Sequence, residues 1–152
     1  MEHVSDITRI IQLAVAPVFL LTAIGTILSA LNNRLGRIVD RRRVIEDRLQ
    51  KGLPEGEQPA KEDVHELGLL ARRISLIYHA IVLAIICALL ICMLVASAFL
   101  GVFVTIDIAR LIGTLFILAM FALTGSLWML LREVFLAVKV GRHDILVKDI
   151  LR

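Results

Sequence analysis

The sequence predicts an all-α integral membrane protein with three transmembrane helices, of which the first two extend into a cytoplasmic antiparallel helical hairpin. The first observation is composition, because 59% of the 152 residues are hydrophobic, whereas a soluble domain is about 45–50% apolar. The second is clustering, because each of three apolar runs is long enough for the roughly 20 helical residues that cross the hydrocarbon core. The runs cover residues 10–31, 74–104 and 111–131. We expect a single membrane domain over residues 1–152.

These runs set the expected boundaries of each segment. The second run is longer than a span requires, so its beginning is assigned to the hairpin together with the polar residues that precede it. Pro17, inside the first run, removes a backbone hydrogen bond, and it either bends that helix or only accommodates packing. The expected segments are transmembrane helices at 10–31, 80–104 and 111–131, a cytoplasmic hairpin at 32–79 and a cytoplasmic tail at 132–152.

The distribution of Lys and Arg predicts the orientation. Residues 32–73 contain ten of them and the tail after residue 131 contains five, whereas Arg9 and Arg110 are the only ones near the other two ends of the spans. Loops rich in Lys and Arg stay in the cytoplasm. The hairpin and the C-terminus are therefore expected in the cytoplasm, and the N-terminus on the outer side.

Two series of apolar residues predict the hairpin. In each, the spacing alternates between three and four residues, as in a coiled-coil seam. Prolines and glycines between residues 52 and 59 break the pattern, so the turn is expected there, with a new helix starting near Lys61. The first series is Leu31, Leu35, Ile38, Arg42, Ile45 and Leu49, and the second is Val64, Leu67, Ala71, Ile74 and Tyr78.

The stretch over residues 17–47 resembles a family of small three-span bacterial membrane proteins that is catalogued as a domain of unknown function. The Asn33–Arg34 pair and the Ile-Val-Asp-Arg run at 38–41 are its most recognisable parts. The resemblance implies a prokaryotic membrane location, and it brings no catalytic residues. Together with the orientation inferred from Lys and Arg, it leads us to expect a multi-pass protein of the bacterial inner membrane with a periplasmic N-terminus. The order of segments is also similar to that of pentameric proton-channel subunits of energy-coupling motors, although residues 80–96 almost lack the polar side chains that those subunits use.

A polar face on the first span is the main candidate for function. Thr22, Thr26, Ser29 and Asn33 are spaced four, three and four residues apart, which places them on one side of a helix. The face lies about 160° from the hairpin seam at 100° per residue. It either packs tightly against another helix or faces water. We predict a homo-oligomeric ion channel that these residues line, with inorganic ions as its cargo.

Two other functions stay open. The first is a non-conducting adaptor that recruits a partner through the cytoplasmic hairpin, in which case the polar face only packs. The second is a carrier of lipid or of a small molecule. The near absence of charge within the spans disfavours charged cargo for such a carrier.

Two groups of ionisable residues stand near the expected inner membrane boundary. Arg41, Arg42 and Arg43 follow the first span by about two turns, so we expect them to contact the anionic headgroups of the bilayer rather than nucleic acid. The second group is expected either to anchor the helices among the headgroups or to gate the channel by sensing protons or ions. This second group is His79, Arg132 and Glu133.

The sequence lacks the patterns that carry common enzyme chemistry. It contains no phosphate-binding G-x-x-x-x-G-K-[ST] loop, no G-x-G-x-x-G and no H-E-x-x-H. The four histidines are scattered, and Cys87 and Cys92 lie in an apolar run where thiols pack as small hydrophobic side chains. We expect no enzyme, no metal site and no cofactor.

Overall fold

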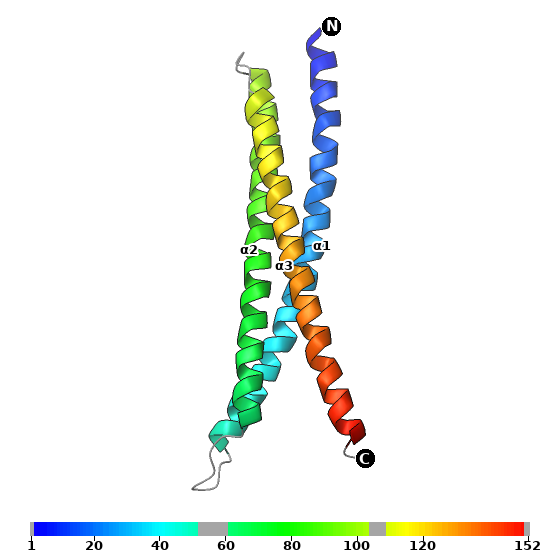
Figure 1. Ribbon diagram of the computed structural model, residues 1–152. Helices are drawn as coiled ribbons and strands as arrows, with labels where there is room; N and C mark the ends of the chain where they lie inside the picture. Colours follow the sequence, from blue (N-terminus) through cyan, green and yellow to red (C-terminus); the bar gives the residue numbers. More distant parts are fainter. Residues whose placement is uncertain (1, 52–60, 104–108, 151–152) are drawn as a thin grey trace. The chain divides into compact units, whose positions relative to one another are not determined.

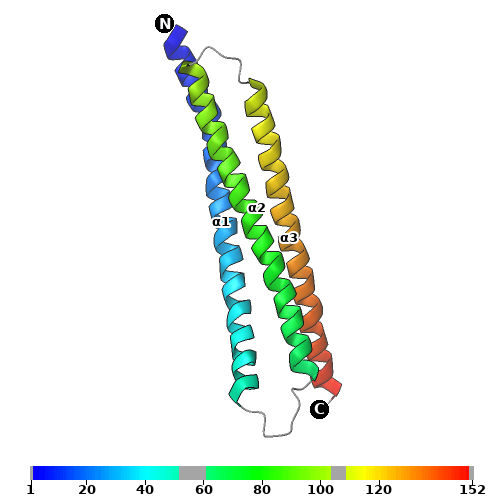
Figure 2. The same cartoon turned by 90° about the vertical axis from the view of Figure 1, so that its left-hand side faces the viewer.

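The computed structural model consists of three long helices, α1 (Glu2–Lys51), α2 (Lys61–Phe103) and α3 (Ala109–Ile150) (Figures 1 and 2). It describes the backbone of these three helices and the side chains of residues 15–50, 64–101 and 109–138. None of the described residues belongs to a strand, so the all-helical prediction is confirmed. The two expected turns, at 52–59 and 105–110, fall mainly outside the described residues.

Each helix is longer than a membrane crossing needs. The helices contain 50, 43 and 42 residues, which at about 1.5 Å per residue exceeds the hydrocarbon thickness of about 30 Å roughly twofold. Helix α1 continues without a break through Pro17. All three helices are long and apolar enough to span a membrane. Helices of this length and composition indicate a multi-pass membrane protein.

The structure divides into two compact units. The first unit is Met1–Ala30 with Ile81–Ser126, and the second is Leu31–Ala80 with Leu127–Arg152. The divisions on α1 and α2 fall within two residues of the positions at which the sequence analysis places the change from span to hairpin. The second unit also contains the extension of α3.

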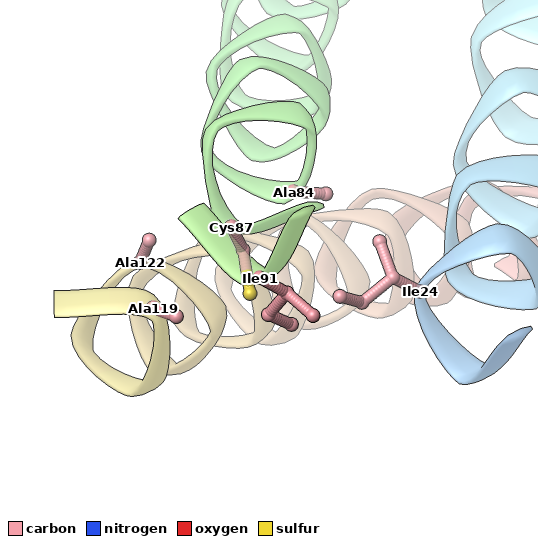
Figure 3. Close-up of a cluster of buried hydrophobic side chains, with 6 residues drawn as sticks. All are labelled: Ile24, Ala84, Cys87, Ile91, Ala119 and Ala122. Atoms are coloured by element: carbon pink, nitrogen blue, oxygen red, sulfur yellow. The ribbon is translucent and has the colours of Figure 1, made fainter. Parts of the chain in front are cut away.

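The core of the first unit is built mainly from small side chains. Figure 3 shows Ile24 of α1 and Ile91 of α2 between the helices, with the Cys87 thiol beside Ala119 of α3. Small residues let helix backbones approach closely, which is the common way for membrane helices to pack. Gly125 shows how close α3 lies to α2, because a Cβ built on it would lie 3.2 Å from Cδ1 of Leu83. The cluster is Ile24, Ala84, Cys87, Ile91, Ala119 and Ala122.

We expect Ala119→Leu to destabilise the first unit. Ala119 is completely buried, and adding three carbons to a filled site costs about 1–3 kcal/mol. Denaturant titration in detergent, followed by circular dichroism, measures the free energy of unfolding. The control is Ala96→Leu on the exposed side of α2, where a change within about 0.5 kcal/mol is expected. Equal effects of the two substitutions would contradict this packing.

The second unit buries the expected seam on α1 but a different one on α2. On α1, Leu31, Ile38 and Ile45 are buried, as the seven-residue period requires. On α2, Leu70 and Ile77 are buried, whereas the expected seam residues Ala71 and Tyr78 are exposed. At these two positions the prediction for α2 was wrong by one residue, or about 100° around the helix, whereas the expected seam residues Leu67 and Ile74 are half-buried. Apolar residues cover every side of α2 from residue 74 onward, so the spacing alone does not define its buried face.

Candidate functional site

Glu133 of α3 is a buried charge in the second unit, with only 1% of its side chain exposed. Both of its carboxylate oxygens accept hydrogen bonds from arginines of the other two helices. Nη1 of Arg34, on α1, donates to Oε2 at 2.7 Å. Nη2 of Arg73, on α2, donates to Oε1 at 2.7 Å, and Nε of the same guanidinium donates at 3.3 Å. We call these three residues the Arg–Glu–Arg cluster.

Helical spacing explains why these side chains face one another. Arg34 lies three residues after the buried Leu31, and Arg73 lies between the buried Leu70 and Ile77. Residues three or four positions apart lie on the same side of a helix. Each arginine is therefore directed toward the side on which its helix packs. On α3, Glu133 is itself the buried residue.

The cluster carries one net positive charge, because two arginines pair with one glutamate. A carboxylate removed from water needs both a counter-ion and hydrogen bonds to its oxygens, because the desolvation penalty is several kcal/mol per ion. Here two guanidinium groups surround one carboxylate. The side chains of Arg34 and Arg73 are 37% and 20% exposed, so both reach from the buried carboxylate toward the surface. The three helices of this unit are thus held together by one ionic site.

A cavity of about 350 Å³ adjoins the Arg–Glu–Arg cluster. We call it the arginine cavity. Two apolar residues, Ile38 and Leu70, line part of its wall, and both are almost fully buried. Nε of Arg41 also donates to Oε1 of Glu66 at 3.0 Å. The remaining lining residues are charged, and they are Arg34, Arg37, Arg41, Arg73 and Glu133.

The three residues expected to gate the channel have different surroundings in the structure. Glu133 is buried, whereas its neighbour Arg132 is exposed. His79 is also exposed, and its Nδ1 donates to the backbone carbonyl of Ser75 at 2.6 Å, since a carbonyl can only accept. Sequence reasoning missed the arginine partners of Glu133. The signal for one of them was present, because Arg73 lies three residues after Leu70 and four before Ile77 on the seam that the structure buries.

The polar face of α1 is exposed along its length. Thr22, Thr26 and Ser29 are exposed in the first unit, and Asn33 is exposed in the second. The Thr26 hydroxyl donates to the carbonyl of Ala23 at 2.7 Å, and the Thr22 hydroxyl makes a longer bond of 3.4 Å to its own helix. Neither α2 nor α3 of the same chain covers these side chains within the described residues. Within the described residues, the polar face is therefore not packed against another helix of the same chain.

The three consecutive arginines have different surroundings. Arg41 reaches the arginine cavity. Arg42 points elsewhere and its Nε donates to Oε1 of Glu46 at 2.7 Å on the same helix. Arg43 is exposed. Only one member of the run therefore contributes to the cavity.

The described residues offer no metal site and no cysteine pair. Within residues 15–50, 64–101 and 109–138, no group of three or more His, Cys, Asp or Glu side chains is placed to hold a metal ion. Cys87 is buried in the first core, as expected of a packed thiol. Cys92 is free but exposed, so it is not the core residue that the sequence suggested.

The fold defines the class: the described residues form an all-helical protein with three helices long and apolar enough to span a membrane. The chain matches the family described as "Protein of unknown function (DUF2721)" over residues 14–143, and it belongs to that family. The resemblance inferred from residues 17–47 is thus confirmed over a much longer segment, which includes the Arg–Glu–Arg cluster and the polar face. Comparisons with curated proteins and with solved structures found no match.

Proposed function

We propose that the protein is a homo-oligomeric ion channel of the bacterial inner membrane in which the polar face of α1 lines the conduction pathway. The observation that carries this proposal is the exposure of Thr22, Thr26, Ser29 and Asn33 on a helix apolar enough to span a membrane. A row of polar side chains on the outside of a single chain suits a pathway that forms when several copies of the chain assemble around it.

The hydrogen bonds of the polar face support water or polar groups as its neighbour. The Thr22 and Thr26 hydroxyls donate hydrogen bonds to carbonyls of their own helix. They can therefore lie against lipid without an unsatisfied donor. Ser29, which lies within the expected span, has no hydrogen-bond partner in the described part of the chain. Polar groups left unsatisfied in hydrocarbon cost several kcal/mol each. A neighbouring subunit or a water-filled path removes that penalty.

The charge distribution supports the accompanying orientation. With ten Lys or Arg in residues 32–73, the positive-inside rule favours a cytoplasmic hairpin and tail and a periplasmic N-terminus. In this arrangement the first unit lies in the hydrocarbon and the second carries the cytoplasmic hairpin. The proposal includes no catalytic step and no cofactor.

Reconstitution of the full-length chain into liposomes tests the proposal. We expect a stable oligomer in detergent and an ion flux that increases with the amount of protein, measured with an entrapped fluorescent indicator. Empty liposomes prepared in parallel give the background. The absence of flux, or an oligomer structure in which α2 or α3 lines the axis, would contradict the proposal.

A non-conducting adaptor is the second candidate, and the exposed charges of the second unit favour it. Arg42, Arg43 and Asp47 are exposed on the part of α1 that belongs to this unit. Two results together would support the adaptor. Liposomes that contain the protein would show no ion flux, and the protein would capture one specific partner only when these residues are unsubstituted. The gating role of His79, Arg132 and Glu133 stays a prediction, which the pH dependence of flux in the His79→Ala and Glu133→Ala variants tests.

A further inference from the structure

We infer that the arginine cavity is a binding site for a phosphate group. Four arginines line it against a single carboxylate, Glu133. Both oxygens of that carboxylate are already bonded to Arg34 and Arg73. Counting Glu66, which accepts from Arg41, the cavity still has two positive charges in excess. The inference concerns the second unit and does not depend on ion conduction.

The arginines come from two helices and surround one space. Arg34, Arg37 and Arg41 lie on α1, spaced three and four residues apart so that they share a side of the helix. Arg73 belongs to α2. Guanidinium groups with this arrangement bind phosphate oxygens in pairs through their planar N–H groups. A run of arginines on a single helix lacks a space that is lined from two helices in this way.

Glu133 holds the guanidinium groups of Arg34 and Arg73 in place and leaves some of their N–H donors available to the ligand. It anchors Arg34 through Nη1 and Arg73 through Nη2 and Nε. An arginine has five N–H donors, so each guanidinium retains donors that these bonds do not use. Fixing the guanidinium groups in advance lowers the entropy lost on binding. The buried carboxylate thus organises the cationic wall.

The size of the cavity favours a small phosphate compound. Its volume of about 350 Å³ is at the low end of the range of about 300–1,000 Å³ for ligand sites. Ile38 and Leu70 provide an apolar wall beside the charges. Arg34 lies three residues beyond the expected end of the first span, at the level where lipid headgroups are found. The two sources of a phosphate group are therefore a lipid headgroup and a soluble phosphate compound.

Calorimetric titration of the detergent-solubilised full-length chain tests the inference. One arm uses inorganic phosphate at constant ionic strength, and the other uses dihexanoyl phosphatidic acid, with dihexanoyl phosphatidylcholine as the zwitterionic comparison. We expect saturable binding in at least one arm. Binding of inorganic phosphate indicates a soluble ligand, and binding of phosphatidic acid alone indicates a lipid headgroup.

The decisive variants are a matched pair of double substitutions. Arg37→Gln/Arg41→Gln removes two charges from the cavity, and we expect it to weaken binding about tenfold or more. Arg42→Gln/Arg43→Gln removes two charges from the same helix outside the cavity, and we expect less than about a twofold change. Each double variant also leaves one glutamate without its arginine, Glu66 or Glu46. Circular dichroism checks that both variants remain helical.

Three results would overturn the inference. The first is the absence of saturable binding in both arms with the unsubstituted chain. The second is an equal loss of binding in the two double variants, which would indicate attraction to the basic helix as a whole. The third is unchanged binding in the cavity variant while it remains folded. None of these measurements involves ion flux, so they leave the channel proposal to its own test.

Discussion

Replacing Glu133 by alanine is expected to destabilise the protein by about 3–5 kcal/mol, which is the usual effect of removing one partner from a buried ion pair. The substitution leaves Arg34 and Arg73 close together without the carboxylate that binds both of them. Two like charges then share a partly buried site, and their hydrogen bonds are lost. Denaturant titration in detergent measures the change in the free energy of unfolding.

The control for this prediction is Glu46→Ala. Glu46 also accepts a hydrogen bond from an arginine, at the same distance of 2.7 Å, but its pair with Arg42 is exposed and lies within one helix. Such a pair contributes about 0.3–0.5 kcal/mol. A second check is the double variant Arg73→Ala/Glu133→Ala, which should differ from the sum of the single variants by about 1 kcal/mol or more. Equal effects at Glu133 and Glu46 would show that the cluster does not hold the helices together.

The second large effect is expected at the polar face of α1. In the proposed channel, Thr26→Leu places a bulky apolar side chain on the wall of the pathway. A hydrophobic constriction expels water and blocks ions. We expect ion flux into liposomes to fall to near background, with the amount of reconstituted oligomer unchanged.

Thr124→Leu is the matched control for Thr26→Leu. Thr124 is an exposed threonine of α3, and its hydroxyl donates to the carbonyl of Met120 at 2.8 Å, much as Thr26 bonds to its own helix. The two substitutions therefore change the same chemistry on different helices. If both abolished flux, or if neither did, the polar face would not be the lining of the pathway.

Helix length and the α1 seam were predictable from the sequence because they depend on repeated features. Apolar runs separated by charged segments indicate three membrane-span-like helices, and no tertiary contact is needed to see them. On α1, polar residues separate Leu31, Ile38 and Ile45, so the seven-residue period stands out. On α2, polar residues do not separate the apolar ones in this way. Ala71 and Tyr78 were predicted to be buried, whereas the buried residues are their neighbours Leu70 and Ile77.

The Arg–Glu–Arg cluster was beyond sequence reasoning because it joins residues 60 and 99 positions apart in the chain. Spacing places a residue on a face of its own helix but does not identify the facing residue on another helix. Arg34 was recognised as part of a family-like stretch, and Glu133 as an ionisable group near the membrane boundary. Their pairing depends on how α1 and α3 pack within the second unit, which a single sequence does not specify.

The wide separation of these partners has a consequence for protein synthesis. The ribosome adds Arg34 to the chain 99 residues before Glu133, which at about 5–20 residues per second corresponds to about 5–20 seconds. Arg73 is added 60 residues before Glu133, and from then on both arginines belong to a nascent chain that still lacks Glu133. A chain interrupted before residue 133 keeps both arginines and lacks the group that neutralises them. Synthesis of α3 thus decides whether the first two helices acquire their shared counter-ion.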